Sequence, residues 1–252
     1  MSDDLTNFPI KTHPTWLIHD SSKLQDFEVC PRMYLFLYAF GWRREGANQH
    51  LVFGESWHKL MEHLHIHGLE DDSAVEAFNI FLKHYRQSFS ESTDEACYPK
   101  NPDNALLALG QYLKKYGNEK FETLYTEVSG TVPVDDERVL HFRLDSLIRD
   151  ERGIVVREHK TTSKESRSWN DQWILKIATG TYSHVAYCMF EEHDVWGLEI
   201  NAAVFRSSKT PQGKGNAFFR IPIRKAKDMM EVWHWNVMHV LDLIEWNFAQ
   251  LK

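Results

Sequence analysis

A β-hairpin is the feature that most constrains the fold of this chain. Residues 139–149 alternate apolar with polar side chains, and residues 154–161 begin with a short run of Ile and Val. The four residues between them, 150–153, are typical of a turn. A turn centred between Glu151 and Arg152 pairs residues whose numbers sum to 303. We therefore expect two neighbouring antiparallel strands in a defined register.

The pattern along the rest of the chain changes from helical to mixed near residue 120. Helices are expected from a Ser21 or Ser22 cap to Val29, from Pro31 to near Gly41, at 51–67, from the Ser73-x-x-Glu76 capping box onward, at 103–116, at 171–192 with a break near Gly180, and at 225–251. Further strands are expected at 123–134, 195–206 and 217–224. This order predicts one α/β domain over 1–252, with a central mixed sheet flanked by helices. Its first part, 1–120, would be an N-terminal helical layer, and 121–252 would hold the sheet and the closing helices.

The composition favours a compact protein outside the membrane. Apolar residues make up 42% of the chain and aromatic residues 13%, which is enough for a sizeable core. No apolar run approaches the roughly 20 residues of a membrane helix, and the acidic N-terminus lacks a signal-peptide core. The three cysteines, Cys30, Cys97 and Cys188, form no Cys-x-x-Cys pair, so we expect free thiols in a soluble intracellular protein.

The charge distribution leaves two interpretations open. A net charge of −7 argues against nucleic acid as a partner. Residues 203–227, however, contain seven basic residues and no acidic one: Arg206, Lys209, Lys214, Arg220, Arg224, Lys225 and Lys227. This segment is either a phosphate-binding strip or a solvated hairpin.

The register of the hairpin places two acidic residues face to face. Asp145 would lie opposite Glu158, and Arg143 opposite Lys160, with Cβ atoms of each pair about 5 Å apart. Two carboxylates at that distance repel each other unless a cation lies between them, and Mg²⁺ binds such oxygen ligands. Lys160 could orient an attacking water or hold a phosphate oxygen, an arrangement suited to phosphodiester hydrolysis. The alternative is a surface hairpin whose charges face water. A register that differs by one residue from the predicted one would place Asp145 and Glu158 on opposite faces of the sheet.

These residues resemble the PD-(D/E)XK nuclease superfamily. Asp145 is followed thirteen positions later by Glu158-His159-Lys160. The segment Ser22 to Tyr34, with its Cys30-Pro31-Arg32 core, and the Gly54-x-x-x-His58 pattern are similar to helix motifs of the RecB-like branch, and Glu127 is similar to its early acidic residue. The resemblance extends from Ser22 to about Tyr187.

The resemblance implies a restriction-endonuclease-like core and a bound Mg²⁺ or Mn²⁺. It implies that His58, Asp145 and Glu158 bind the metal together with the backbone carbonyl of His159. Lys160 would be the catalytic lysine, acting with the two carboxylates, and Glu127 would act indirectly, through water or through the ligands.

Two departures from the branch pattern affect these expectations. The branch often carries a Gln-x-x-x-Tyr helix that grips DNA, whereas this chain has Ser183 in the Gln position and keeps Tyr187. Cys30 matches the first cysteine of iron–sulfur relatives, but the C-terminal cysteine triplet is missing. We therefore expect no iron–sulfur cluster and a packing role for Cys30.

The expected function is a metal-dependent DNA nuclease. The helical layer around 22–67 and the segment 203–227 would form the walls of a DNA groove, with Arg32, Lys164, Arg167, Lys209, Lys214 and Tyr187 as DNA contacts. Trp169 and Tyr34 could stack on bases, although core packing is favoured for Tyr34. By analogy with the branch, we expect an exonuclease of phage or prokaryotic recombination and repair in the cytoplasm. The acidic net charge is compatible with a protein partner that delivers the DNA.

Two alternatives remain at this stage. The first is a DNA-binding protein of the same fold without catalysis. The second is a di-iron carboxylate bundle, since Glu62-x-x-His65 and Glu231-x-x-His234 have the ligand spacing of that class. The strand-rich middle of the chain argues against the bundle and favours a solvated cluster of His63, His65 and His67.

Overall fold

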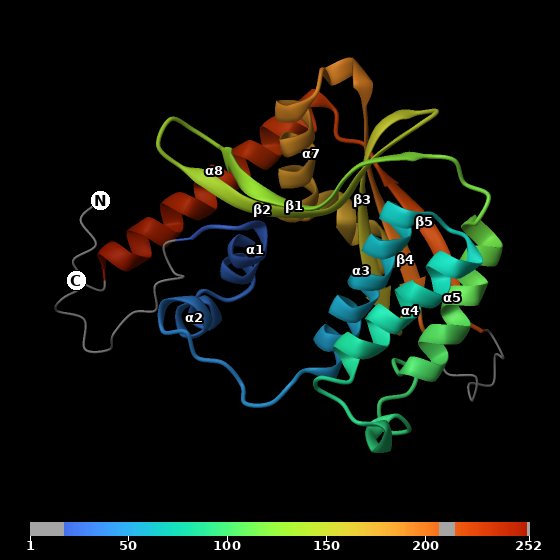
Figure 1. The fold of residues 1–252 in the computed structure, drawn as a ribbon. Helices are drawn as coiled ribbons and strands as arrows, with labels where there is room; N and C mark the ends of the chain where they lie inside the picture. The colour runs from blue at the N-terminus through green and yellow to red at the C-terminus, as the bar shows by residue number, and fades with distance from the viewer. Residues whose placement is uncertain (1–17, 207–214, 251–252) are drawn as a thin grey trace.

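A five-stranded mixed sheet forms the centre of the protein. The computed structural model describes residues 18–206 and 215–250. The strands follow the order β1 (Glu122–Pro133), β2 (Val139–Asp150), β3 (Gly153–Thr162), β4 (Val195–Val204) and β5 (Ala217–Ile223). All neighbouring strands are antiparallel except β3 and β4, which are parallel (Figure 1). The predicted α/β class with a restriction-endonuclease-like core is confirmed.

Helices cover both faces of this sheet. On one side lie α1 (Ser21–Val29), α2 (Pro31–Tyr34) with the following π-helix η2 (Leu35–Ala39), α7 (Ile177–Met189) and α8 (Lys227–Ala249) (Figure 1). On the other side lie α3 (Gln49–His67), α4 (Asp71–Tyr85) and α5 (Pro102–Tyr116). Short turns complete the order: η3 (Glu91–Thr93), α6 (Arg167–Asp171), η4 (Gln172–Leu175) and η5 (Glu192–Asp194). Within the described ranges, we find no helix long and apolar enough to cross a lipid bilayer.

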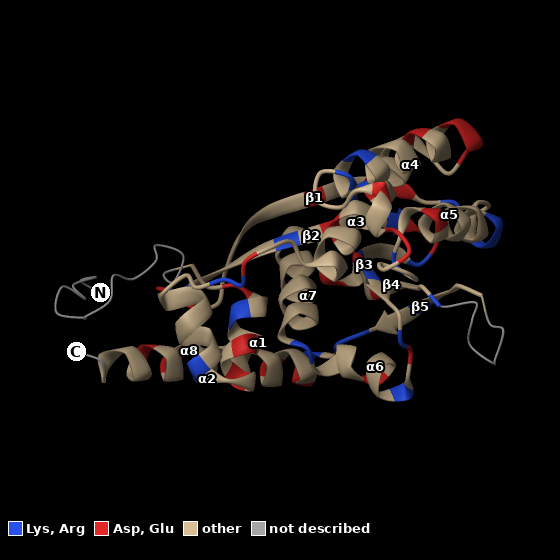
Figure 2. Cartoon of the chain, turned by 90° about the horizontal axis from the view of Figure 1, so that it is seen from below, with Lys and Arg blue, Asp and Glu red and all other residues tan. Residues whose placement is uncertain are grey.

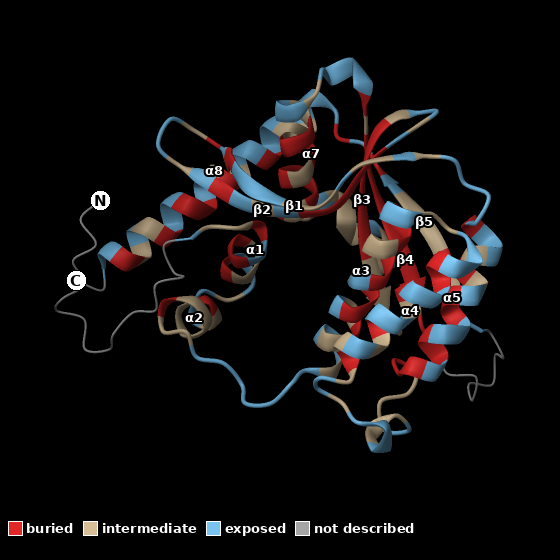
Figure 3. Cartoon of the chain, viewed as in Figure 1, coloured by how far each residue is buried: buried red, intermediate tan, exposed pale blue. Residues whose placement is uncertain are grey.

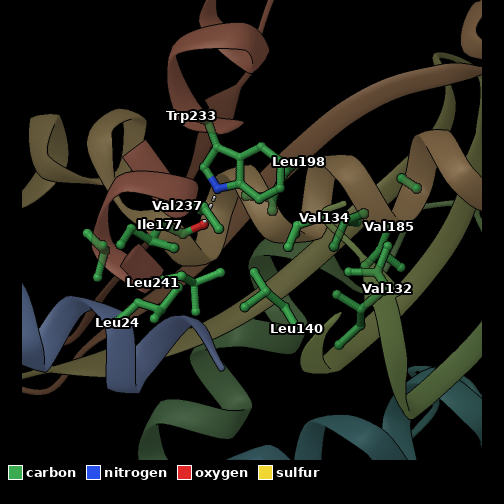
Figure 4. Packing of buried hydrophobic residues seen from close by; sticks show 14 of the residues in the cluster. Leu24, Val132, Val134, Leu140, Ile177, Val185, Leu198, Trp233, Val237 and Leu241 are labelled. Carbon is green, nitrogen blue, oxygen red and sulfur yellow. Dashed lines mark hydrogen bonds between the residues drawn. The ribbon is translucent and has the colours of Figure 1, made fainter. Parts of the chain in front are cut away.

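Two hydrophobic cores hold these layers to the sheet. The core on the α7 and α8 side includes Leu24, Leu140, Leu198, Trp233 and Leu241 (Figure 4). The core on the α3 and α5 side includes Phe53, Trp57, Phe81, Tyr112 and Phe205. Strands β3 and β4 are buried along most of their length as a result (Figure 3). A parallel pair buried on both faces is typical of α/β proteins.

The register predicted for the hairpin is confirmed. Ser146 pairs with Arg157, and Asp150 pairs with Gly153, so the pair numbers sum to 303. The tight turn between β2 and β3 therefore determines which side chains share a face of the sheet.

Three local predictions are wrong for identifiable reasons. Helix α1 is capped by Asp20, whose Oδ1 accepts hydrogen bonds from the backbone N–H groups of Ser22 (2.9 Å) and Lys23 (3.0 Å), and not by a serine. Helix α4 begins at Asp71, so Ser73 is buried inside its first turn and forms no capping box. Helix α7 continues through Gly180 without a break.

Gly180 is explained by packing against Trp233. A Cβ atom at Gly180 would lie 2.0 Å from Cδ1 of Trp233. The indole in turn donates a hydrogen bond from Nε1 to the carbonyl oxygen of Ile177 at 3.1 Å (Figure 4). The glycine thus makes room for the contact between α7 and α8, and it does not end the helix.

We predict that Gly180→Ala destabilises the protein although alanine favours helices. The added methyl must displace the buried indole, which costs about 1–3 kcal/mol in the free energy of unfolding. Gly110→Ala in α5 is the matched control, because a Cβ there meets none of the described atoms within 4 Å. The control should gain up to about 1 kcal/mol. Urea unfolding of both variants checks this, and equal stabilisation by the two would contradict it.

Candidate active site

Asp145 on β2 lies between two acidic residues of the neighbouring strands. Towards β3, the ladder of paired residues ends at Ser146 and Arg157, and the next contact is a hydrogen bond of 2.7 Å from the backbone N–H of His159 to Asp145 Oδ2. Towards β1, the pairs Thr126–Ser146 and Val128–Leu144 place Glu127 opposite Asp145. Glu158 on β3 lies close enough to Asp145 for the charge of Asp145 to raise its pKa.

Helix α3 supplies an imidazole to the same place. His58 Nδ1 lies 3.2 Å from Asp145 Oδ1. The helix is oriented by its buried residues Phe53, Trp57 and Leu60, which pack in the second core. One ligand atom each from His58, Glu127 and Asp145 lies within 4.8 Å of the others. These three residues have the donor types of a divalent cation site.

Glu127 has an unusual backbone conformation. Its φ is +49°, and it is the one non-glycine residue with positive φ among residues 18–206 and 215–250. Such a conformation is unfavourable for a residue with a Cβ atom and often marks a functional position. Arg143 Nε donates a hydrogen bond to the Glu127 carboxylate. The sequence suggested only an indirect role for Glu127, whereas the structure brings it into the group that surrounds Asp145.

Glu158 and Lys160 lie on β3 and line a cavity of about 260 Å³. Lys160 Nζ donates a hydrogen bond of 2.5 Å to Glu158 Oε1. The other carboxylate oxygen, Oε2, is buried and has no hydrogen-bond partner among the described residues. Residues of α1 and α7, including Ser22 and Tyr182, form the opposite wall of the cavity.

The electrostatics of this cluster favour a bound cation. Burial, and then the nearby Asp145 carboxylate, raise the pKa of Glu158 to about 7. Burial alone would raise the pKa of Asp145 too, but His58 outweighs it and holds that pKa well below its usual range. Burial lowers the pKa of His58, and Asp145 outweighs this effect and raises it. Buried carboxylates and an unpartnered oxygen therefore fit a hard divalent ion such as Mg²⁺ or Mn²⁺.

The side chain of His159 belongs to a buried polar network on the opposite face. Its Nδ1 lies 2.8 Å from Asn201 Nδ2, and its ring centroid lies 5.0 Å from that of His65. Asn201 also donates to the hydroxyl of Tyr112 at 3.0 Å. Burial lowers the pKa of His159 well below its ordinary value, so the imidazole is neutral. The network anchors β3 next to the acidic cluster.

The segment 203–227 is not a continuous phosphate-binding strip where the structure describes it. Arg220 is bound by Glu119 at 2.9 Å and Glu199 at 3.1 Å, and Arg206 pairs with Glu165 at 2.6 Å. Lys225 is buried and donates to the carbonyl oxygen of Ile174. Lys209 and Lys214 lie outside the described residues. In the view of Figure 2, Lys and Arg are scattered over several elements.

The remaining predicted DNA contacts, Lys164, Arg167 and Arg32, do not line the cavity of Glu158 and Lys160. Lys164 and Arg167 follow β3 and are exposed, and Arg167 pairs with Asp171 at 3.3 Å. Arg32 lies on α2 over the ring of Phe36, at 5.6 Å.

Of the two tyrosines Tyr182 and Tyr187 on α7, Tyr182 lines the cavity of Glu158 and Lys160. Tyr187 donates a hydrogen bond of 3.4 Å to the carbonyl oxygen of Lys225, and Ser183 donates one of 2.8 Å to that of Thr179. Tyr182 lines the cavity with Glu158 and Lys160, and burial followed by the Glu158 charge raises its pKa. The role of Tyr187 in DNA binding stays a prediction.

Other sequence predictions have mixed outcomes. Tyr34 is buried in the first core, which confirms its packing role, and Trp169 packs edge-on against Trp173 at 5.3 Å. All three cysteines, each within the described ranges, are free thiols. Cys30 Sγ accepts a hydrogen bond of 3.4 Å from the backbone N–H of Met33. Cys30 therefore caps the N-terminus of α2, in addition to the packing role expected from the sequence.

The di-iron alternative is wrong. The two Glu-x-x-His pairs lie on α3 and α8, on different sides of the sheet (Figure 1). His234 bonds to the carbonyl oxygen of Val134 at 2.6 Å. His65 is not solvated as expected, since it is only 5% exposed and packs against Phe121 and His159.

Comparison with protein-family models identifies the superfamily of this chain. The family model of the PD-(D/E)XK nuclease superfamily matches residues 21–246, and the chain belongs to this superfamily. Membership suggests a nuclease that acts on DNA, and such nucleases typically use divalent metals. No curated protein matches the chain. Among solved structures, the chain is similar to the crystal structure of SSO0001, with 12% identity, a TM-score of 0.32, and coverage of 88% of this chain and 83% of that chain.

The buried His65 leads to a prediction about stability and pH. Burial, and then Arg157, lower its pKa to about 3, whereas an unfolded histidine has a pKa of about 6.5. Between these values the unfolded chain binds more protons, so the stability falls as the pH falls. We predict that His65 accounts for a loss of about 2 kcal/mol between pH 7 and pH 5.

Urea unfolding of wild type and His65→Gln at the two pH values measures this loss. The variant should be less sensitive to pH by that amount. An identical pH dependence of the two proteins would show that His65 does not titrate as described.

Proposed function

We propose that this protein is a Mg²⁺- or Mn²⁺-dependent deoxyribonuclease of the RecB-like branch, acting as an exonuclease in phage or prokaryotic DNA recombination and repair. The convergence of His58, Asp145, Glu158 and Lys160 from three elements is the observation that carries the proposal. Superfamily membership supports DNA as the substrate. The branch, the exonuclease role and the cytoplasm of a prokaryotic or phage-infected cell follow by analogy with the motifs on α1 and α3.

The proposed metal ligands are the side chains of His58, Asp145 and Glu158 and the carbonyl oxygen of His159. The unpartnered Oε2 of Glu158 supports this assignment, because a buried carboxylate oxygen without a partner is unfavourable. We add Glu127 to the set, since a carboxylate oxygen of Glu127 lies within 4.8 Å of a ligand atom of His58 and of Asp145. The ion would lower the pKa of the attacking water and stabilise negative charge on the phosphate.

Lys160 is the proposed catalytic lysine. Its ammonium is held by Glu158 at the wall of the cavity, where it can orient a water and bind a non-bridging phosphate oxygen. Burial lowers the pKa of Lys160, but Glu158 outweighs this effect and raises it, so the side chain stays charged. In the reaction the water oxygen bonds to phosphorus while the bond from phosphorus to the leaving sugar oxygen breaks.

The net charge of −7 is compatible with a protein partner that brings DNA to the site. Nucleic-acid binding depends strongly on positive charge, and many described Arg side chains, such as Arg152, Arg157 and Arg220, are paired with carboxylates.

We predict that Lys160→Ala and Asp145→Asn each lower the rate of DNA cleavage at least about 100-fold with either metal. The first change removes the ammonium placed at the reacting phosphate, and the second removes a charged ligand of the proposed metal. Lys83→Ala on the exposed side of α4 is the control and should cleave like the wild type. End-labelled linear DNA and circular DNA measure the activity, and an exonuclease degrades only the first.

The comparison also tests the alternative without catalysis. Equal cleavage by wild type and Lys160→Ala, or no cleavage by the wild type with either metal, would support a DNA-binding protein that has kept only the nuclease fold. Cleavage of circular DNA would replace the exonuclease role with an endonuclease role.

A further inference from the structure

An exposed aromatic side chain stands in the loop that joins η2 to α3. Trp42 is 53% exposed, and it is followed by Arg43 and Arg44, which are exposed as well. One face of the indole stacks on Phe36, with ring centroids 5.1 Å apart and 3° between the planes. The packing fixes the orientation of the indole and leaves much of its surface in contact with solvent.

This loop is connected to the acidic cluster by a continuous lining of residues. The guanidinium of Arg43 lies 5.1 Å above the ring of Tyr38. Tyr38 lines a cavity of about 340 Å³ that also includes Arg143 and Tyr182. Tyr182 and the two serines at the start of α1 line the cavity of Glu158 and Lys160 as well, so the two cavities share a wall.

Packing accounts for only part of the indole surface, since the side chain of Trp42 remains exposed. Phe36 and Phe40 are half-buried, with ring centroids 6.2 Å apart, and the indole packs on both of them, at 5.1 Å from Phe36 and 5.6 Å from Phe40. An exposed indole beside two arginines is the combination that binds single-stranded nucleic acid, since any base can stack on the ring and the guanidinium groups attract the phosphates. Paired bases inside a duplex offer no free face for such stacking.

We propose that Trp42 is a stacking platform for an unpaired base, with Arg43 and Arg44 holding the adjoining phosphates. The strand would then run along Tyr38 and Tyr182 to Glu158 and Lys160. The inference rests on the proposed nuclease function and specifies its substrate as single-stranded DNA or a frayed end. Arg32, which contacts the other member of the stacked pair, Phe36, lies at the same platform.

The test is binding of labelled oligothymidylate, measured by fluorescence anisotropy in EDTA so that no cleavage occurs. Trp42→Ala should bind about 5- to 100-fold more weakly than the wild type, as expected for the loss of one base–aromatic stack. Trp42→Phe should recover much of the affinity. Trp235→Ala is the matched control, because Trp235 is 65% exposed on α8 and should bind like the wild type.

A duplex closed at both ends by non-nucleotide linkers, which has no unpaired base and no end that frays, and a small phosphodiester separate this inference from the proposed function. Binding of the duplex should be unchanged in Trp42→Ala. Hydrolysis of bis(p-nitrophenyl) phosphate with Mn²⁺ should also be unchanged, since that substrate reaches Lys160 but is too short to reach Trp42.

Any other result of these three measurements contradicts either the stacking platform or the nuclease function. Wild-type affinity of Trp42→Ala for oligothymidylate, or an equal loss for the duplex, overturns the stacking platform. A loss of small-substrate hydrolysis in Trp42→Ala shows that the residue acts through the fold. Failure of the wild type to hydrolyse any phosphodiester refutes the nuclease function, and the binding result then stands separately.

Discussion

The hydrogen bond from the backbone of His159 to the carboxylate of Asp145 is the interaction on which the candidate site depends. It continues the β2–β3 hairpin beyond its last residue pair and ties the central carboxylate to the strand that carries Glu158 and Lys160. A slip of one residue would exchange the two faces of β3. Such a slip would be unfavourable, because it would move the buried His159 side chain to the other face and break its contact with Asn201.

The site is locally unfavourable, and the surrounding structure stabilises it. Asp145 and Glu158 are both buried, and burial, followed by the charge of Asp145, raises the pKa of Glu158 to about 7. Glu127 adds a positive φ on the neighbouring strand. Two hydrophobic cores on opposite faces of the sheet hold these strands in place. Strain and repulsion of this kind are typical of sites prepared for a ligand that relieves them, here a divalent cation.

Much of the fold could be predicted from the sequence, because alternation and turn residues are local signals. They located all five strands and the register that brings Asp145 near Glu158. Features decided by tertiary contacts could not be predicted. The burial of His65, the ion pairs of Arg220 and the place of Tyr182 in the cavity wall depend on how helices pack on the sheet, and a helical pattern alone does not show this. The positive φ of Glu127 has no sequence signal, since only Asn, Asp or Gly would have suggested it.

A crystal of the protein grown with Mn²⁺ and measured at the manganese absorption edge tests the central claim most directly. An anomalous peak bound by His58, Asp145 and Glu158, with the Lys160 ammonium beside it, is the result we expect. The absence of a peak at Asp145 in crystals that contain the ion, or a peak bound only by residues elsewhere on the chain, would contradict a metal-dependent nuclease site.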